Sequence, residues 1–101
     1  MADAIDVYPA VVAASSTPDT VALNPMVAYS IAHDAEDASG TPDENTIYLS
    51  FSDTVDADSS AGTNKAKLLA GRAMPIRRGV KQIRFASAAG APTFTVVPIT
   101  D

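Results

Sequence analysis

Hydrophobic and polar side chains alternate in several short stretches of the chain. In 45–52, the apolar Ile47, Leu49 and Phe51 share one parity, while Tyr48 and serine side chains take the other. The same alternation recurs in 26–33, 82–87 and 92–99. Because successive side chains of a strand point to opposite faces, a period of two predicts strands that each bury one face.

Helices have little support in the sequence. Proline recurs at positions 9, 18, 25, 42, 75, 92 and 98, and Gly62 and Gly71 interrupt the wide interval between 43 and 74. We count six to eight short strands separated by turn-rich breaks. The sequence therefore predicts an all-β fold, a small antiparallel β-sandwich or barrel of the jelly-roll or immunoglobulin-like kind.

The connections between the predicted strands carry their own signals. The segment 86–91 joins the last two strands and is short enough for a hairpin in which Gly90 takes a positive φ. A further strand is expected at 73–76, where Pro75 has no N–H and so predicts a sheet edge or a bulge. The stretch 65–69 fits either one helical turn or a short strand.

A turn-like break at 15–19 divides the chain into an amino-terminal arm, 1–14, and a single β-domain, 15–101. The arm is more apolar than a disordered tail usually is. We expect it to pack on its own domain or on a neighbour. The residues predicted to make its contacts are Ile5, Val7, Tyr8, Val11 and Val12.

The charged residues are segregated along the chain. All seven basic residues lie between Lys65 and Arg84, a window without acids, whereas 1–64 contains eleven acids and no base. One explanation is internal, with basic strands paired to acidic loops, each exposed pair contributing about 0–1 kcal/mol. The other is external, with head-to-tail contacts between copies or docking of the basic side onto an acidic partner.

The sequence offers little material for catalysis. It has no Cys, a single His and no Gly-x-Ser-x-Gly turn, so no activated nucleophile is evident. His33 falls on the apolar parity of its strand, which indicates a structural role. Acidic residues gather in 34–44 and 53–64, and a cation in either loop stays open, although neither matches the EF-hand pattern. We expect no enzymatic activity and no cofactor.

Nucleic acids, nucleotides and membranes are disfavoured as partners. The net charge of −5 would repel nucleic acid, and the glycines are too widely spaced for a phosphate-binding loop. The longest apolar run, about six residues, is far below the roughly 20 that span a bilayer. The first residues carry Asp3 and Asp6 without a base, so neither a signal peptide nor a membrane anchor is expected.

The second half of the chain resembles small β-sandwich virion proteins of tailed bacteriophages, over roughly 26–99. The resemblance lies in the order of strands and turns rather than in a chemical signature. That order is 47–51, a polar loop, Leu69-Ala70-Gly71-Arg72, Pro75-Ile76, Gly79-Val80, Ile83-Arg84-Phe85, Ala88-Ala89-Gly90 and Phe94-Thr95-Val96. Proteins of this kind include capsid decoration (cement) proteins, head-fibre bases and tail-associated proteins.

The resemblance implies a non-enzymatic, usually oligomeric structural protein of the virion, bound to a symmetric shell or tube, and by itself does not choose between them. We expect the protein to be made in the host cytoplasm and placed on the capsid surface. Its expected role is that of a decoration protein that binds and stabilises the assembled head, with the major capsid protein or another virion subunit as partner. The residues predicted to form the basic docking face are Arg72, Arg77, Arg78, Lys81 and Arg84.

Two alternatives remain open at this point. The same features suit a structural protein of the neck or tail. They also suit a module, displayed on the particle, that binds a host glycan or receptor through 34–44 or 53–64.

Overall fold

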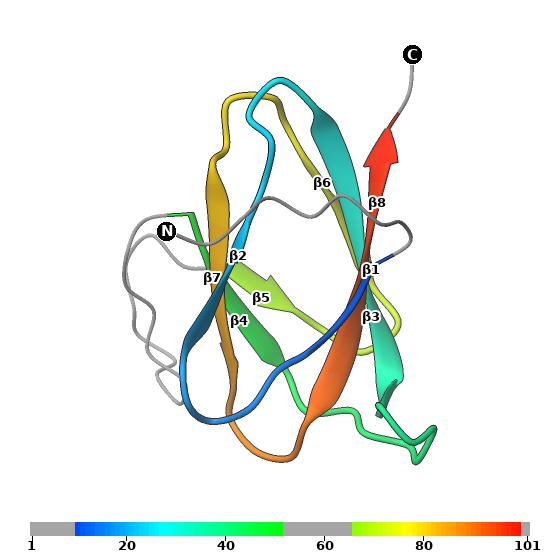
Figure 1. The fold of residues 1–101 in the computed structure, drawn as a ribbon. Coiled ribbons are helices and arrows are strands. Elements are labelled where there is room, and N and C mark those ends of the chain that lie inside the picture. The colour runs from blue at the N-terminus through cyan, green and yellow to red at the C-terminus, as the bar shows by residue number, and fades with distance from the viewer. Residues whose placement is uncertain (1–9, 52–65, 100–101) are drawn as a thin grey trace.

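The computed structural model describes residues 10–51 and 66–99, which form eight strands in two facing antiparallel sheets (Figure 1). The all-β prediction is confirmed. No membrane-spanning helix occurs among these described residues. The strands are β1 (Ala10–Ala13), β2 (Asp19–Ala22), β3 (Ala28–Asp37), β4 (Ile47–Ser50), β5 (Ala66–Leu68), β6 (Ala73–Ile76), β7 (Gln82–Ser87) and β8 (Pro92–Ile99).

The order of the strands distinguishes the two sandwich types that the sequence left open. One sheet has the order β1-β8-β3-β6 and the other β2-β7-β4-β5. The first strand therefore pairs with the last, the second with the seventh, the third with the sixth and the fourth with the fifth. This nested antiparallel pairing, split over two four-stranded sheets, is the arrangement of a jelly roll.

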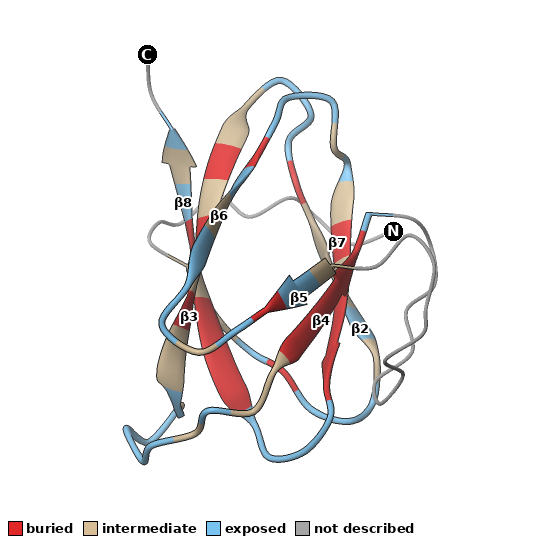
Figure 2. Cartoon of the chain, turned by 180° about the vertical axis from the view of Figure 1, so that it is seen from behind, coloured by how far each residue is buried: buried red, intermediate tan, exposed pale blue. Residues whose placement is uncertain are grey.

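The core lies between the two sheets, where the buried parities of the strands meet (Figure 2). Phe85 of β7 and Phe94 of β8 contact each other edge to face across it, with ring centroids 5.0 Å apart. The largest fully buried side chains around this pair are Tyr29, Ile31, Ile47, Leu49, Leu68, Ile83 and Val96. The alternation seen in the sequence thus marks the side chains between the sheets, with two exceptions in the 45–52 stretch: Phe51 is exposed, and Tyr48 and Ser50 on the opposite parity are buried.

Several local predictions are confirmed. Strands occur at 73–76, 82–87 and 92–99 with the expected bounds, and a strand rather than a helical turn forms at Ala66–Leu68. Pro75 lies in β6, an edge strand of its sheet, where the lack of an N–H costs no hydrogen bond between strands. Gly90 has a φ of 64°.

The prediction that 86–91 closes a hairpin is wrong. β7 pairs with β2 and β4, whereas β8 pairs with β1 and β3, so the segment crosses from one sheet to the other. Two strands that bury the same core have the same alternating pattern whether they are hydrogen-bonded neighbours or face each other. The sequence pattern could not separate these two cases.

The first strand lies in the stretch that the sequence assigned to the arm. β1 pairs with β8, and the Ala14 that follows is almost fully buried. Residues 10–13 are therefore an integral edge of the sandwich.

Candidate functional site

Three of the five predicted docking residues lie together in the β6–β7 connection. Arg77, Arg78 and Lys81 are all exposed there, around Gly79, whose φ of 98° makes the turn. The connection is held to the β2–β3 connection beside it: Gly79 N donates to Pro25 O at 2.7 Å. We call Arg77, Arg78 and Lys81 the basic end.

An apolar side chain lies beside these charges. The Arg78 Nε donates to the backbone oxygen of Met26 at 3.2 Å, and the Met26 side chain is 78 % exposed. The basic end therefore combines three cations with one protruding thioether, a flexible group that adapts to irregular surfaces.

The other two predicted docking residues lie elsewhere. Arg72 precedes β6 at the opposite end of that strand, where its backbone oxygen accepts a hydrogen bond from His33 N at 2.9 Å. Arg84 is half-buried on the outer face of the β2-β7-β4-β5 sheet and donates through Nη1 to Thr20 Oγ1 at 3.3 Å. The five residues do not form a single continuous face.

Acidic residues gather at the other end of the sandwich. β3 begins beside the basic end, since Tyr29 pairs with Ile76, and runs for ten residues to Asp37. At about 3.3 Å per residue this strand covers about 30 Å. The β6–β7 and β3–β4 connections accordingly lie at opposite ends of the molecule (Figure 1). The acids at the second end, which we call the acidic end, are Asp34, Glu36, Asp37, Asp43 and Glu44.

The carboxylate of Asp43 organises the acidic end. Its Oδ1 accepts hydrogen bonds from Asn45 N and Nδ2, and its Oδ2 accepts one from Ala91 N at 2.9 Å. Burial alone would raise the pKa of Asp43, but the hydrogen bonds from Ala91 and Asn45 outweigh it and hold the pKa below its usual value of 3.8. Asp43 therefore ties the β3–β4 connection to the turn between β7 and β8 as an ionised group.

Two other carboxylates are also held by neutral donors. The Ser39 hydroxyl and the Thr41 N–H hydrogen-bond to Asp37 and lower the pKa of its carboxyl group. The carboxylate of Asp34 accepts hydrogen bonds at 2.9 Å from the hydroxyls of Thr93 and Thr95. These contacts orient the acids without neutralising their charge, so the acidic end keeps its negative potential.

His33 is buried between the ends, and both of its ring nitrogens are engaged. Nδ1 accepts a hydrogen bond from Ala35 N at 2.9 Å, which leaves the proton on Nε2 to donate to Asn45 O at 2.7 Å. This bond fixes the start of a bulge in β3, where Ala35 has a φ of 59°. The geometry supports the structural role predicted for His33.

No group of three or more His, Asp or Glu side chains suited to a metal ion occurs within 10–51 and 66–99. The second acidic loop, 53–64, lies outside the residues that the structure describes. The same is true of Ile5, Val7 and Tyr8 in the predicted arm. Of the other two predicted arm contacts, Val11 is 63 % exposed and Val12 packs against the core.

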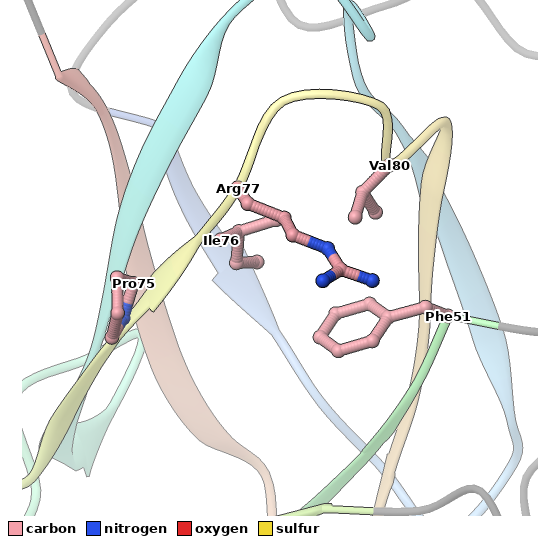
Figure 3. A pocket seen from close by; sticks show the side chains of 5 residues that line it. All are labelled: Phe51, Pro75, Ile76, Arg77 and Val80. Atoms are coloured by element: carbon pink, nitrogen blue, oxygen red, sulfur yellow. The ribbon is translucent and has the colours of Figure 1, made fainter.

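A groove next to the basic end was not foreseen from the sequence. It has a volume of about 410 Å³ and is lined by Phe51, Pro75, Ile76, Arg77 and Val80 (Figure 3). The alternating pattern placed Phe51 in the core with Ile47 and Leu49, but β4 ends at Ser50 and Phe51 is 42 % exposed. The sequence feature that could have indicated the groove is Val80, a single apolar residue within a run of basic ones.

The outer face of the β1-β8-β3-β6 sheet carries small, hydroxyl and apolar side chains. Besides Val11, its exposed large members are Val97 and Ile99 of β8. Asp34, whose carboxylate accepts hydrogen bonds from Thr93 and Thr95 of β8, lies on the same face.

Comparisons of the chain with family models, with curated proteins and with solved structures found no match.

Proposed function

We propose that this protein is a non-enzymatic decoration protein of a tailed-phage head, which docks onto the assembled shell through its basic end. The observation that carries the proposal is the separation of charge along the sandwich. Arg77, Arg78 and Lys81 lie at one end, and the acids in the last part of β3 and after it lie at the other. A molecule with this polarity presents one end to an acidic surface in a single orientation.

The hydrogen bonds of the charged groups support an external use of the charge. Asp34, Asp37 and Asp43 are held by hydroxyl, amide and backbone donors, and Arg84 donates to the neutral Thr20 hydroxyl. For these four described groups the contacts do not show internal pairing of acids with bases, the other explanation of the segregated sequence. Charges left unneutralised raise the rate and the specificity of association with a complementary surface.

The expected interface has an apolar centre and a charged rim. Met26, with its largely exposed side chain, would enter a shallow depression on the shell, while Arg78 and Lys81 pair with carboxylates around it. Protein interfaces commonly have this arrangement, and Met and Arg are enriched in them. The partner is therefore expected to be an acidic patch on the major capsid protein or on another virion subunit.

Stabilisation of the head would follow from mass action. A protein that binds only the assembled shell stabilises that shell by RT ln(1 + [L]/Kd), without any chemical step. A jelly-roll sandwich suits this role because its two edges and two ends present rigid surfaces.

The test is a charge reversal with a matched control. The variant Arg78→Glu/Lys81→Glu changes the basic end, and Lys67→Glu/Arg72→Glu makes the same change in net charge at exposed sites elsewhere. Each protein is added to purified expanded heads that lack it, and the bound fraction is measured after sedimentation. All four positions are exposed, so both variants should fold, which circular dichroism checks.

The proposal expects occupancy to fall at least tenfold for the basic-end variant and to change little for the control. Equal loss in both variants would show that only net charge matters. Unchanged occupancy of the basic-end variant would remove the docking role of these residues.

A further inference from the structure

The groove beside the basic end has apolar walls and one cation. Ile76 forms its floor at 2 % exposure, half-buried Val80 forms one wall, and the partly exposed ring of Phe51 forms another. The guanidinium of Arg77 points across the groove toward the ring of Phe51 (Figure 3). An apolar cavity with a single charged group selects a ligand that joins an apolar side chain to a carboxylate.

The edge of the groove favours insertion of a side chain over addition of a strand. β6 is an edge strand, but its central Pro75 has no N–H with which to pair an added strand. Recognition must therefore come from a side chain that fills the cavity and from the charge of Arg77. A short peptide segment with an apolar residue next to an acidic one meets both needs.

The chain itself contains such a segment outside the described residues. In its first nine residues, M-A-D-A-I-D-V-Y-P, the charged side chains are both acidic, and Asp6 lies between Ile5 and Val7. We propose that the groove of one copy holds the amino-terminal arm of a second copy, with Ile5 between Ile76 and Val80 and with Asp6 paired to Arg77. This inference goes beyond shell docking, because it assigns a self-association site in which Arg77 of the basic end pairs with a second copy, while Arg78 and Lys81 contact the shell.

The position of the arm favours a second copy over the same chain. The described chain starts at Ala10 in β1, and β8 and β3 separate β1 from β6, so the two edges are about 14 Å apart. Ile5 is five residues from Ala10 and reaches about 17 Å when fully extended. An arm of this length can cross the face of the sheet, but almost no length remains with which it could turn around β6 and enter the groove of its own chain. A groove on an adjacent copy imposes no such detour.

Arm exchange of this kind links identical subunits. The arm and the groove are different surfaces, so the contact either is made reciprocally by two copies or repeats around a ring. On a shell, neighbouring copies joined in this way would each add their own contact to the lattice.

The test is a reciprocal charge swap in the full chain. Sedimentation equilibrium of the wild type is compared with Asp6→Arg, with Arg77→Asp and with the double variant. Each single swap should weaken self-association at least tenfold, because it replaces a charge-assisted pair with two like charges. The double variant should restore it. Asp6→Arg/Arg78→Asp is the matched control, because it moves the compensating charge by one residue and should not restore association.

A second measurement uses a synthetic peptide with the sequence of residues 1–9. An excess of it should dissociate wild-type oligomers, and a scrambled peptide of the same composition should not. A wild type that stays monomeric, or oligomers that neither charge swap weakens, would overturn the inference. So would a double variant that fails to recover association. None of these outcomes bears on shell docking, which the variants of Arg78 and Lys81 test separately.

Discussion

The carboxylate of Asp43 lies directly against the Cα of Gly90, although the two residues belong to different connections of the sandwich. A Cβ on Gly90 would collide with Asp43 Oδ2 and would come within 2.7 Å of Asn45 Nδ2. Gly90 also has a φ of 64°, a region that other residues enter only with strain. The closure of the acidic end therefore depends on the absence of a side chain at this position.

We expect Gly90→Ala to destabilise the protein by more than backbone strain alone. Gly71→Ala is the control, because Gly71 has a φ of 74° and open space around its Cα. Strain should cost about 1–2 kcal/mol in both variants, and the collision should add about 1–3 kcal/mol at Gly90. Urea unfolding measures the loss of free energy of unfolding in each variant. Equal losses in the two variants would contradict the close contact.

The lowered pKa of Asp43 predicts a pH-dependent contribution to stability. An Asp in an unfolded chain has a pKa of about 3.9, and the folded-state pKa of Asp43 lies below its usual value. The contribution is therefore fully present above the unfolded-state pKa and is lost as the pH falls through the folded-state pKa. Asp43→Asn should lower the free energy of unfolding by about 1–2 kcal/mol at neutral pH.

Asp43→Asn should also make the free energy of unfolding less dependent on pH in the acid range. Between about pH 5 and pH 2, the wild type should lose more stability than Asp43→Asn, because only the wild type protonates this carboxylate. Thermal unfolding across that range gives both curves. Parallel curves would show that the hydrogen bonds to Asp43 contribute no stability that depends on its charge.

The edge-to-face contact of Phe85 and Phe94 predicts coupling between the two sheets. A double-mutant cycle with Leu at each position should give a coupling free energy of about 0.5–1.5 kcal/mol. Phe94→Ala alone should cost about 3–5 kcal/mol, since the side chain is fully buried. Additive effects in the cycle would mean that the rings contribute through burial and not through their mutual contact.

Docking through the basic end should weaken in salt. The Debye length falls from about 10 Å at 0.1 M to about 3 Å at 1 M, which screens the exposed cations of Arg78 and Lys81. Occupancy on heads should decline over that range, and the decline should be shallower for Arg78→Glu/Lys81→Glu. Binding that does not respond to salt would point to the apolar face of Val11, Val97 and Ile99 instead.

The sequence was sufficient to predict β3 to β8 and the core-facing parity of the long strands, because burial of one face imposes a period of two. It did not predict β1, which falls in the stretch assigned to the arm, or β2, which begins at the turn-like break, or the burial of both faces of β4. It was not sufficient to predict which strands pair. The segment 86–91 has the length of a hairpin, yet it crosses between sheets, since nothing in its residues distinguishes a tight turn from a corner. Pairing in a jelly roll is set by contacts between the ends of the chain, which local pattern does not encode.

The candidate site was predictable in part. Arg77, Arg78 and Lys81 are neighbours in the sequence and remain neighbours in the turn, whereas Arg84 points to the outer face of a sheet because of its parity in β7. The acidic end follows from the length of β3, which carries Asp37 away from the basic end. The groove could not be predicted, because it requires Phe51 and Val80, 29 positions apart, to lie beside the same edge strand.

The central claim is that this protein decorates a phage head, and copy number tests it most directly. Quantitative mass spectrometry of purified virions gives the ratio of this chain to the major capsid protein. The proposed function predicts a copy number that scales with the number of shell subunits, and therefore a fixed ratio to the major capsid protein, as expected for a protein bound at every equivalent site. A count of a few copies per particle would place the protein in the neck or tail, and its absence from the particle would contradict the account.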